Sequence, residues 1–110
     1  MAFNEKLAER VRKELKGRRG LLERQMFGGL AILLRGNMCC GVHGDELIVR
    51  LAPEETDKAL TAPGARLFDL TGRPMKGWLL VGPAGTKTAA ALRKWVGIAA
   101  EYAASLPAKA

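Results

Sequence analysis

The sequence predicts an α+β domain, a two-layer sandwich in which helices cover one face of an antiparallel sheet. Three observations predict it: an amphipathic helix pattern at each end of the chain, short apolar runs between them, and glycine-containing turns that separate those runs. Terminal helices around hairpin-linked strands are typical of a sheet with its helices on one side. The 110 residues suit one core, so we place a single domain over residues 1–110.

The first helix is predicted over residues 4–16. Asn4 is a good N-cap, and apolar residues recur at every fourth position from Phe3 to Leu15. Gly17 then ends the pattern. The apolar stripe is narrow, so we expect this helix to lie on the surface with its basic side in water.

Three strands are predicted between about residues 30 and 51. Each run is apolar and too short for a typical helix. Two-residue hairpin signals, Gly36-Asn37 and Gly44-Asp45, separate them. The sequence therefore predicts an antiparallel meander, with strands at 30–34, 38–42 and 47–51.

The second half adds two helices and two strands. A proline and several acidic residues mark the start of a short helix, and an apolar stripe marks the last helix. The predicted elements are a helix at 53–60, two strands within about 66–81 and a helix at 88–106. The order α-β(3)-α-β(2)-α implies a five-stranded antiparallel sheet, but the pattern leaves the strand order open.

The net charge of +7 is the unusual feature of the composition. Residues 1–24 carry eight basic and four acidic side chains. Such a charge is typical of a protein that binds nucleic acid, a membrane surface or an acidic partner, but it also occurs in proteins that are merely basic. Because acidic residues are interleaved with the cations at helical spacing, we expect the first helix to have an ordinary solvated face, and any nucleic-acid binding to be weak and non-specific.

The chain is expected to act in the cytoplasm. No apolar run approaches the about 20 residues that cross a bilayer, and the N-terminus lacks the apolar stretch of a signal peptide. We expect no membrane association. Cys39 and Cys40 are predicted to be reduced, because neighbouring strand residues point to opposite faces of a sheet.

Two predicted strands are apolar on both sides, at 30–34 and 78–81. Either they are central strands that loops partly cover, or the open sheet face is buried against another chain. A homodimer or a docked partner, with a contact near Ile32 or Trp78, follows from the second interpretation.

No enzymatic chemistry is predicted. The segment GPAGTKT at 82–88 lacks the spacing of a phosphate-binding loop and is more typical of a turn before a helix. His43 and Asp45 flank a hairpin tip, a solvent-exposed position that is poorly suited to shifting the pKa of a catalytic group. One histidine and two cysteines are too few for a structural zinc site. We therefore expect no cofactor and no metal.

The turn before the last strand is the strongest candidate for a partner-binding surface. It brings two cations close to a methionine and a tryptophan, the composition of an interface hot spot. The alternative is a turn whose tryptophan simply packs in the core. The candidate partner-binding residues are Arg50, Arg73, Met75, Lys76 and Trp78.

Four strings of the sequence resemble the TfoX N-terminal domain family of competence regulators. They occur in order over roughly residues 24–107, and they are MFGGLAILL (26–34), GNMCCGV (36–42), ELIVRL (46–51) and FDLTGRPMKGWLLV (68–81). The resemblance implies the same α-β(3)-α-β(2)-α order that the patterns predict. Longer members carry a second helical domain, which these 110 residues do not include, so we expect a single-domain member.

The resemblance implies a role in bacterial transcription regulation, since the best-known members control competence genes together with a partner protein. The sequence therefore predicts a non-enzymatic protein-interaction module that acts through a protein partner, in the transcription machinery by resemblance. The alternative is a basic nucleic-acid-binding accessory protein.

Overall fold

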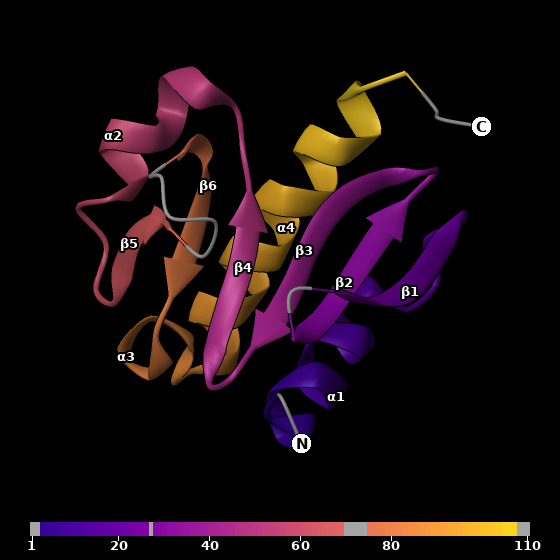
Figure 1. The fold of residues 1–110 in the computed structure, drawn as a ribbon, viewed down its shortest axis with the longest axis horizontal. Coiled ribbons are helices and arrows are strands. Elements are labelled where there is room, and N and C mark those ends of the chain that lie inside the picture. The colour runs from indigo at the N-terminus through magenta and orange to yellow at the C-terminus, as the bar shows by residue number, and fades with distance from the viewer. Residues whose placement is uncertain (1–2, 27, 70–74, 108–110) are drawn as a thin grey trace.

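A computed structural model describes residues 3–26, 28–69 and 75–107 of the chain (Figure 1). It confirms the α+β class and the antiparallel sheet. The helical elements are α1 (Glu5–Leu15), the 3₁₀ turn η1 (Pro53–Glu55), α2 (Thr56–Ala59), α3 (Pro83–Thr86) and α4 (Ala89–Ser105). The strands are β1 (Leu21–Met26), β2 (Gly29–Leu34), β3 (Asn37–His43), β4 (Glu46–Arg50), β5 (Ala65–Phe68) and β6 (Met75–Val81).

The described part of the sheet has six strands in the order β1-β2-β3-β4-β6-β5, so the predicted count of five is wrong. The additional strand is β1, which pairs with β2 from Leu21↔Leu34 to Met26↔Gly29. β1 is an edge strand, and its Leu22 is 50 % exposed. Because polar residues occur on both of its faces, it lacks the apolar alternation by which a strand is recognised from sequence.

The predicted helices form with small differences at their ends. α1 begins after Asn4, whose side chain accepts a hydrogen bond from the Leu7 N–H, and α4 begins after Thr88, which caps Ala91 in the same way. The predicted helix at 53–60 is divided into η1 and α2. The short helix α3 was not predicted, because residues 82–88 suggested only a turn.

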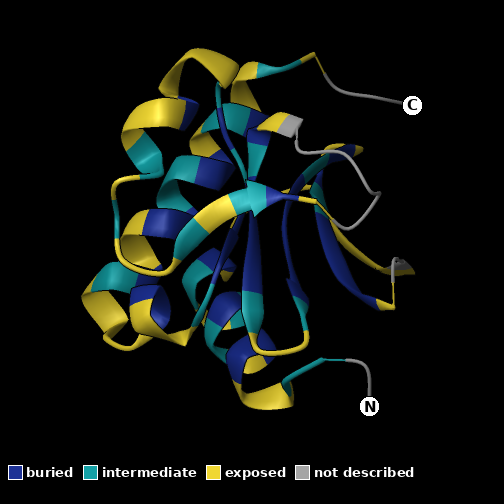
Figure 2. Ribbon diagram, turned by 60° about the vertical axis from the view of Figure 1, so that its left-hand side comes forward, coloured by how far each residue is buried: buried dark blue, intermediate teal, exposed yellow. Residues whose placement is uncertain are grey.

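The helices lie on one side of the sheet and leave the other side open (Figure 2). α4 packs against β2, β3 and β4, and α1 packs against α4 and β3. The main core forms between these layers, and β2, β4 and β6 contribute alternate residues to it. Its largest fully buried members are Leu15, Ile32, Leu47, Leu79, Leu92, Val11, Val42, Val49 and Val81.

Ile32 does not lie on the open face, so its predicted position there is wrong. The register Ile32↔Cys40 and Cys40↔Val49 places these residues on the helix-covered face. The open face carries a second, smaller cluster, in which Ile48, Phe68 and Leu80 are buried. Both sides of β2 and β6 are thus apolar, as predicted, and the helices cover one of them.

Cys39 and Cys40 are both free and fully buried, and both belong to the main core. The expectation that their side chains diverge to opposite faces is wrong. The pairing register shifts between Ile32 and Leu33, which oppose Cys40 and Met38, so Cys39 is the extra residue of a β-bulge. The hydrogen bond that Cys40 shares with Cys39, together with burial, raises the pKa of the Cys40 thiol well above its ordinary value.

Candidate functional site

The candidate site lies at the end of β4 and on the open face of β6. Strand pairing places Arg50 directly opposite Trp78. The Arg50 guanidinium carbon lies 5.1 Å from the centroid of the Trp78 ring and 5.6 Å from that of Tyr102 in α4. Both distances are within the range in which a ring attracts a cation. Arg50 therefore joins the last strand to the last helix at one end of the sheet.

Trp78 also packs within its own chain. Its ring centroid lies 6.0 Å from that of Phe68, with the ring planes tilted by 53°. Trp78 and Met38 are only partly buried, and they pack over Ile48 and Leu80. Part of each side chain therefore remains at the surface, above a buried apolar base. We call Met38, Arg50, Phe68, Trp78 and Tyr102 the Trp78 cluster.

The five predicted partner-binding residues are not all in this cluster. Arg50 and Trp78 are brought into contact, whereas Lys76 forms an ion pair with Asp57 at 3.9 Å. The Lys76 and Asp57 side chains are 68 % and 81 % exposed, so this pair contributes little to stability. Met75 begins β6, but its side chain lies outside the described part of the structure, and Arg73 lies outside the described residues altogether.

Sequence reasoning missed the contribution of Tyr102, Phe68 and Met38 to this site. Tyr102 lies within the helix predicted at 88–106 and has no sequence signal of its own. The contact between Arg50 and Trp78 depends on β4 lying beside β6, a strand order that no local pattern reveals. A sequence signal was present only for the tryptophan and its neighbouring cations.

Several cations elsewhere are held by acidic partners. Arg12 of α1 forms ion pairs with Glu9 and with Glu23 of β1, the second at 2.7 Å. Arg93 of α4 pairs with Glu14 at 3.2 Å. The bond from Arg12 lowers the pKa of Glu23. Ion pairs thus occupy part of the basic surface around α1, and these cations are less available to bind the phosphates of a nucleic acid.

Arg66 is engaged in the same way at the other edge of the sheet. It pairs with Glu46 at 2.7 Å and with Asp69 at 3.0 Å. Arg50 differs from these arginines, because its neighbours are aromatic rings rather than carboxylates. Within the described residues its guanidinium donates one hydrogen bond, a long one of 3.4 Å to the Met38 carbonyl oxygen.

The segment 82–88, which the sequence suggests as a turn before a helix, connects two elements of the fold. Pro83–Thr86 forms α3, and Thr88 caps α4, so the segment 82–88 is a connection between β6 and α4. Within residues 3–26, 28–69 and 75–107, no three His, Cys, Asp or Glu side chains gather where they could hold a metal ion. None of the helices in these ranges is long and apolar enough to cross a membrane.

Comparison with known proteins identifies one family. A sequence model described as the TfoX N-terminal domain matches residues 13–103. Neither a curated protein nor a solved structure matches the chain.

Proposed function

Because the chain belongs to the TfoX N-terminal domain family, we propose that it is a non-enzymatic interaction module that binds an acidic surface of a protein partner through the Trp78 cluster. The observation that carries this proposal is the position of Arg50 between Trp78 and Tyr102. Arginine and large aromatic residues dominate binding energies at protein interfaces. By resemblance to the competence regulators, we place the partner in the transcription machinery of the bacterial cytoplasm.

The chemistry of Arg50 supports an acidic partner. When a guanidinium stacks on an aromatic ring through its flat face, the N–H groups along its edge stay free. These groups can bind a carboxylate with two parallel hydrogen bonds. Within the described residues, one long bond to Met38 leaves most of these donors available. The rings also hold the side chain in place, which lowers the entropy lost on binding.

The surroundings of Arg50 favour a protein over a nucleic acid. Trp78 and Met38 add partly exposed apolar surface beside the cation, as at the core of a protein interface. A nucleic-acid surface would instead need many free cations along one face. Arg12, Arg66 and Arg93 are all paired with carboxylates.

Site-specific photo-crosslinking tests the proposal. A photoreactive amino acid replaces exposed Lys76 in β6, and the matched control replaces exposed Lys13 in α1. We expect position 76 to crosslink one protein species in cells and position 13 not to do so. Arg50→Glu should abolish the crosslink, because it places a negative charge against an acidic partner.

The products of the same experiment distinguish the alternatives. A crosslinked product that contains only this chain would show that the surface forms a homodimer and does not bind a different protein. Adducts with nucleic acid from position 13 would favour the nucleic-acid-binding alternative. A crosslink at position 76 that is unaffected by Arg50→Glu would contradict the proposed role of the Trp78 cluster.

A further inference from the structure

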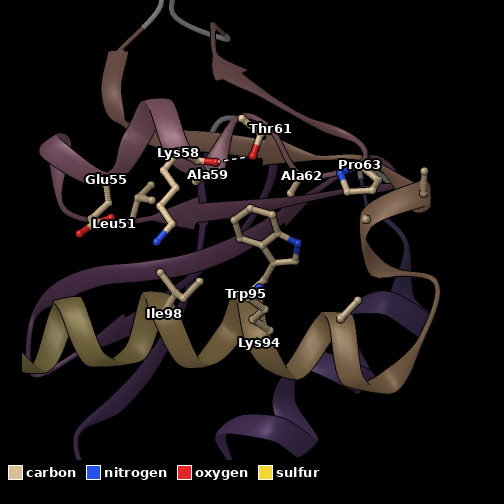
Figure 3. Close-up of a pocket in the computed structure, with 13 residues that line it drawn as sticks. Leu51, Glu55, Lys58, Ala59, Thr61, Ala62, Pro63, Lys94, Trp95 and Ile98 are labelled. Carbon is tan, nitrogen blue, oxygen red and sulfur yellow. Dashed lines mark hydrogen bonds between the residues drawn. The ribbon is translucent and has the colours of Figure 1, made fainter.

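A pocket of about 520 Å³ lies between α2 and α4 (Figure 3). None of the described residues that line it belongs to the Trp78 cluster. The segment from Leu51 to Pro63 forms one wall, and α4 forms the wall that faces it. α3 closes one end with Ala84 and Gly85. The volume is in the range of small-molecule binding sites. We call it the α2–α4 pocket.

The inner surface of the pocket is apolar. The Trp95 indole stands on α4 and is directed toward the residues 59–63 on the opposite wall, with Ile98 one turn further along the helix (Figure 3). Trp95 is only 6 % exposed, so its ring is fixed by the core. Alanines line much of the remaining wall and leave the space that larger side chains would fill; they are Ala59, Ala62, Ala84 and Ala91.

The walls of the pocket are held in place by close contacts. A Cβ atom on Gly85 would lie 2.4 Å from the Pro63 carbonyl oxygen, so α3 lies against the opposite wall with no room for a side chain at this position. The Thr61 hydroxyl donates a 2.7 Å hydrogen bond to the Lys58 carbonyl oxygen at the end of α2 (Figure 3). A pocket that is already formed loses little free energy to ordering when a ligand binds.

Two cations lie at the rim. Lys58 extends from α2 across the opening toward α4, and Lys94 lies on α4 next to Trp95 (Figure 3). Within the described residues, neither lysine forms an ion pair, whereas nearby Lys76 and Arg93 each have a carboxylate partner. Of the described residues that line the pocket, Glu55 alone is acidic. The rim therefore has a net positive charge above an apolar floor.

We propose that the α2–α4 pocket binds a small amphipathic carboxylate. Its apolar body lies against Trp95 and Ile98, and its carboxylate is bound by Lys58 and Lys94. The lysines supply the charge complementarity, because an apolar site with two unpaired cations at its mouth favours an anion with an apolar tail over a neutral molecule. This site is independent of the function proposed for the Trp78 cluster.

Octanoate is a suitable probe, and Trp95 reports its binding. The chain contains two tryptophans, so Trp78→Phe leaves Trp95 as the only indole. We expect octanoate to change the Trp95 fluorescence saturably, and octanol, which has the same tail without the charge, to bind about tenfold more weakly. The wild-type chain gives a second measurement, because a ligand that binds the folded state raises its Tm.

Substitutions at the rim test the recognition of the carboxylate. Lys58→Gln with Lys94→Gln should weaken octanoate binding by about tenfold or more, while Lys13→Gln in α1 should leave it unchanged. Glu55→Gln should tighten binding, because it removes the negative charge of Glu55 from the rim. These opposite signs are not expected from a general loss of stability.

Three results would overturn the proposal: no saturable response of fluorescence or Tm to millimolar octanoate, equal affinity for octanol, or unchanged affinity in the double lysine variant. Each concerns this pocket alone, so none of them affects the role proposed for the Trp78 cluster.

Discussion

The hydroxyl oxygen of Thr56 accepts a 2.8 Å hydrogen bond from the backbone N–H of Gly77. Both groups are buried, and the bond fixes the start of α2 to β6. Thr56 follows Glu55, which lines the α2–α4 pocket, and Gly77 precedes Trp78. The Gly77 carbonyl oxygen in turn accepts a bond from the Leu51 N–H at 2.9 Å. Gly77 has a φ of +87°, a conformation that residues with a side chain rarely adopt.

Thr56→Val should lower the free energy of unfolding by about 1–3 kcal/mol, because it keeps the side-chain shape but leaves the buried Gly77 N–H without an acceptor. Urea unfolding followed by circular dichroism measures the change. Thr61→Val is the matched control, since its hydroxyl is exposed and should contribute much less. Thr56→Ser keeps the hydroxyl and should therefore retain most of the stability that Thr56→Val loses. Equal losses of stability in Thr56→Val and Thr61→Val would contradict this role.

The ion pair of Arg12 with Glu23 should make the attachment of α1 to β1 dependent on pH. Arg12 lowers the pKa of Glu23 from its ordinary value of 4.5. A lowered carboxyl pKa stabilises the folded state above the unfolded-state value, and this contribution is lost as the pH falls through the folded-state value. Both side chains are partly exposed, so the contribution is small.

Glu23→Gln should therefore destabilise the protein slightly at pH 7, and the difference from the wild type should shrink as the pH is lowered below 4.5. Denaturant unfolding at a series of pH values measures it. Glu101→Gln in α4 is the control, because Glu101 is exposed and forms no ion pair within the described residues. A difference that grows toward acidic pH would have the wrong sign.

The two cysteines should be free but protected in the folded protein. Both thiols are fully buried, so labelling by a thiol reagent should be slow under native conditions. The unfolded, unreduced protein should show two reactive thiols, the full cysteine content of the chain. A count near zero, or zinc bound in stoichiometric amount, would show that this expectation is wrong.

Any affinity for nucleic acid should be weak and sensitive to salt. Contacts between cations and phosphates release counterions, so the affinity should fall steeply between about 50 and 200 mM salt. Fluorescence anisotropy with labelled DNA of unrelated sequences measures this. Tight, sequence-selective binding at the higher salt would instead support the nucleic-acid-binding alternative.

The sequence predicted the regular elements well and the long-range pairings poorly. Hairpin signals such as Gly44-Asp45 located the β3–β4 turn, and Asn4 located the start of α1, because these signals act over a few residues. The bulge at Cys39 and the edge strand β1 were missed, since neither has a distinctive local pattern. Both the bulge and the edge strand are defined by pairing with a neighbouring strand.

The same distinction applies to the candidate site. Trp78 and its neighbouring cations have the composition of an interface, which is visible in the sequence. The position of Arg50 between Trp78 and Tyr102 depends on packing between three distant segments. The α2–α4 pocket likewise arises from small residues on separate elements, and single alanines give no sequence signal.

Binding of the crosslinked partner to Arg50 variants tests the central claim most directly. Calorimetric titration of the purified partner should give affinities in the order wild type, Arg50→Lys, Arg50→Glu. Lysine keeps the charge but loses the planar, two-pronged contact, and glutamate reverses the charge. We predict a loss of about tenfold or more for Arg50→Glu, with Lys13→Glu unchanged. Equal affinities for the wild type and Arg50→Glu would contradict the account.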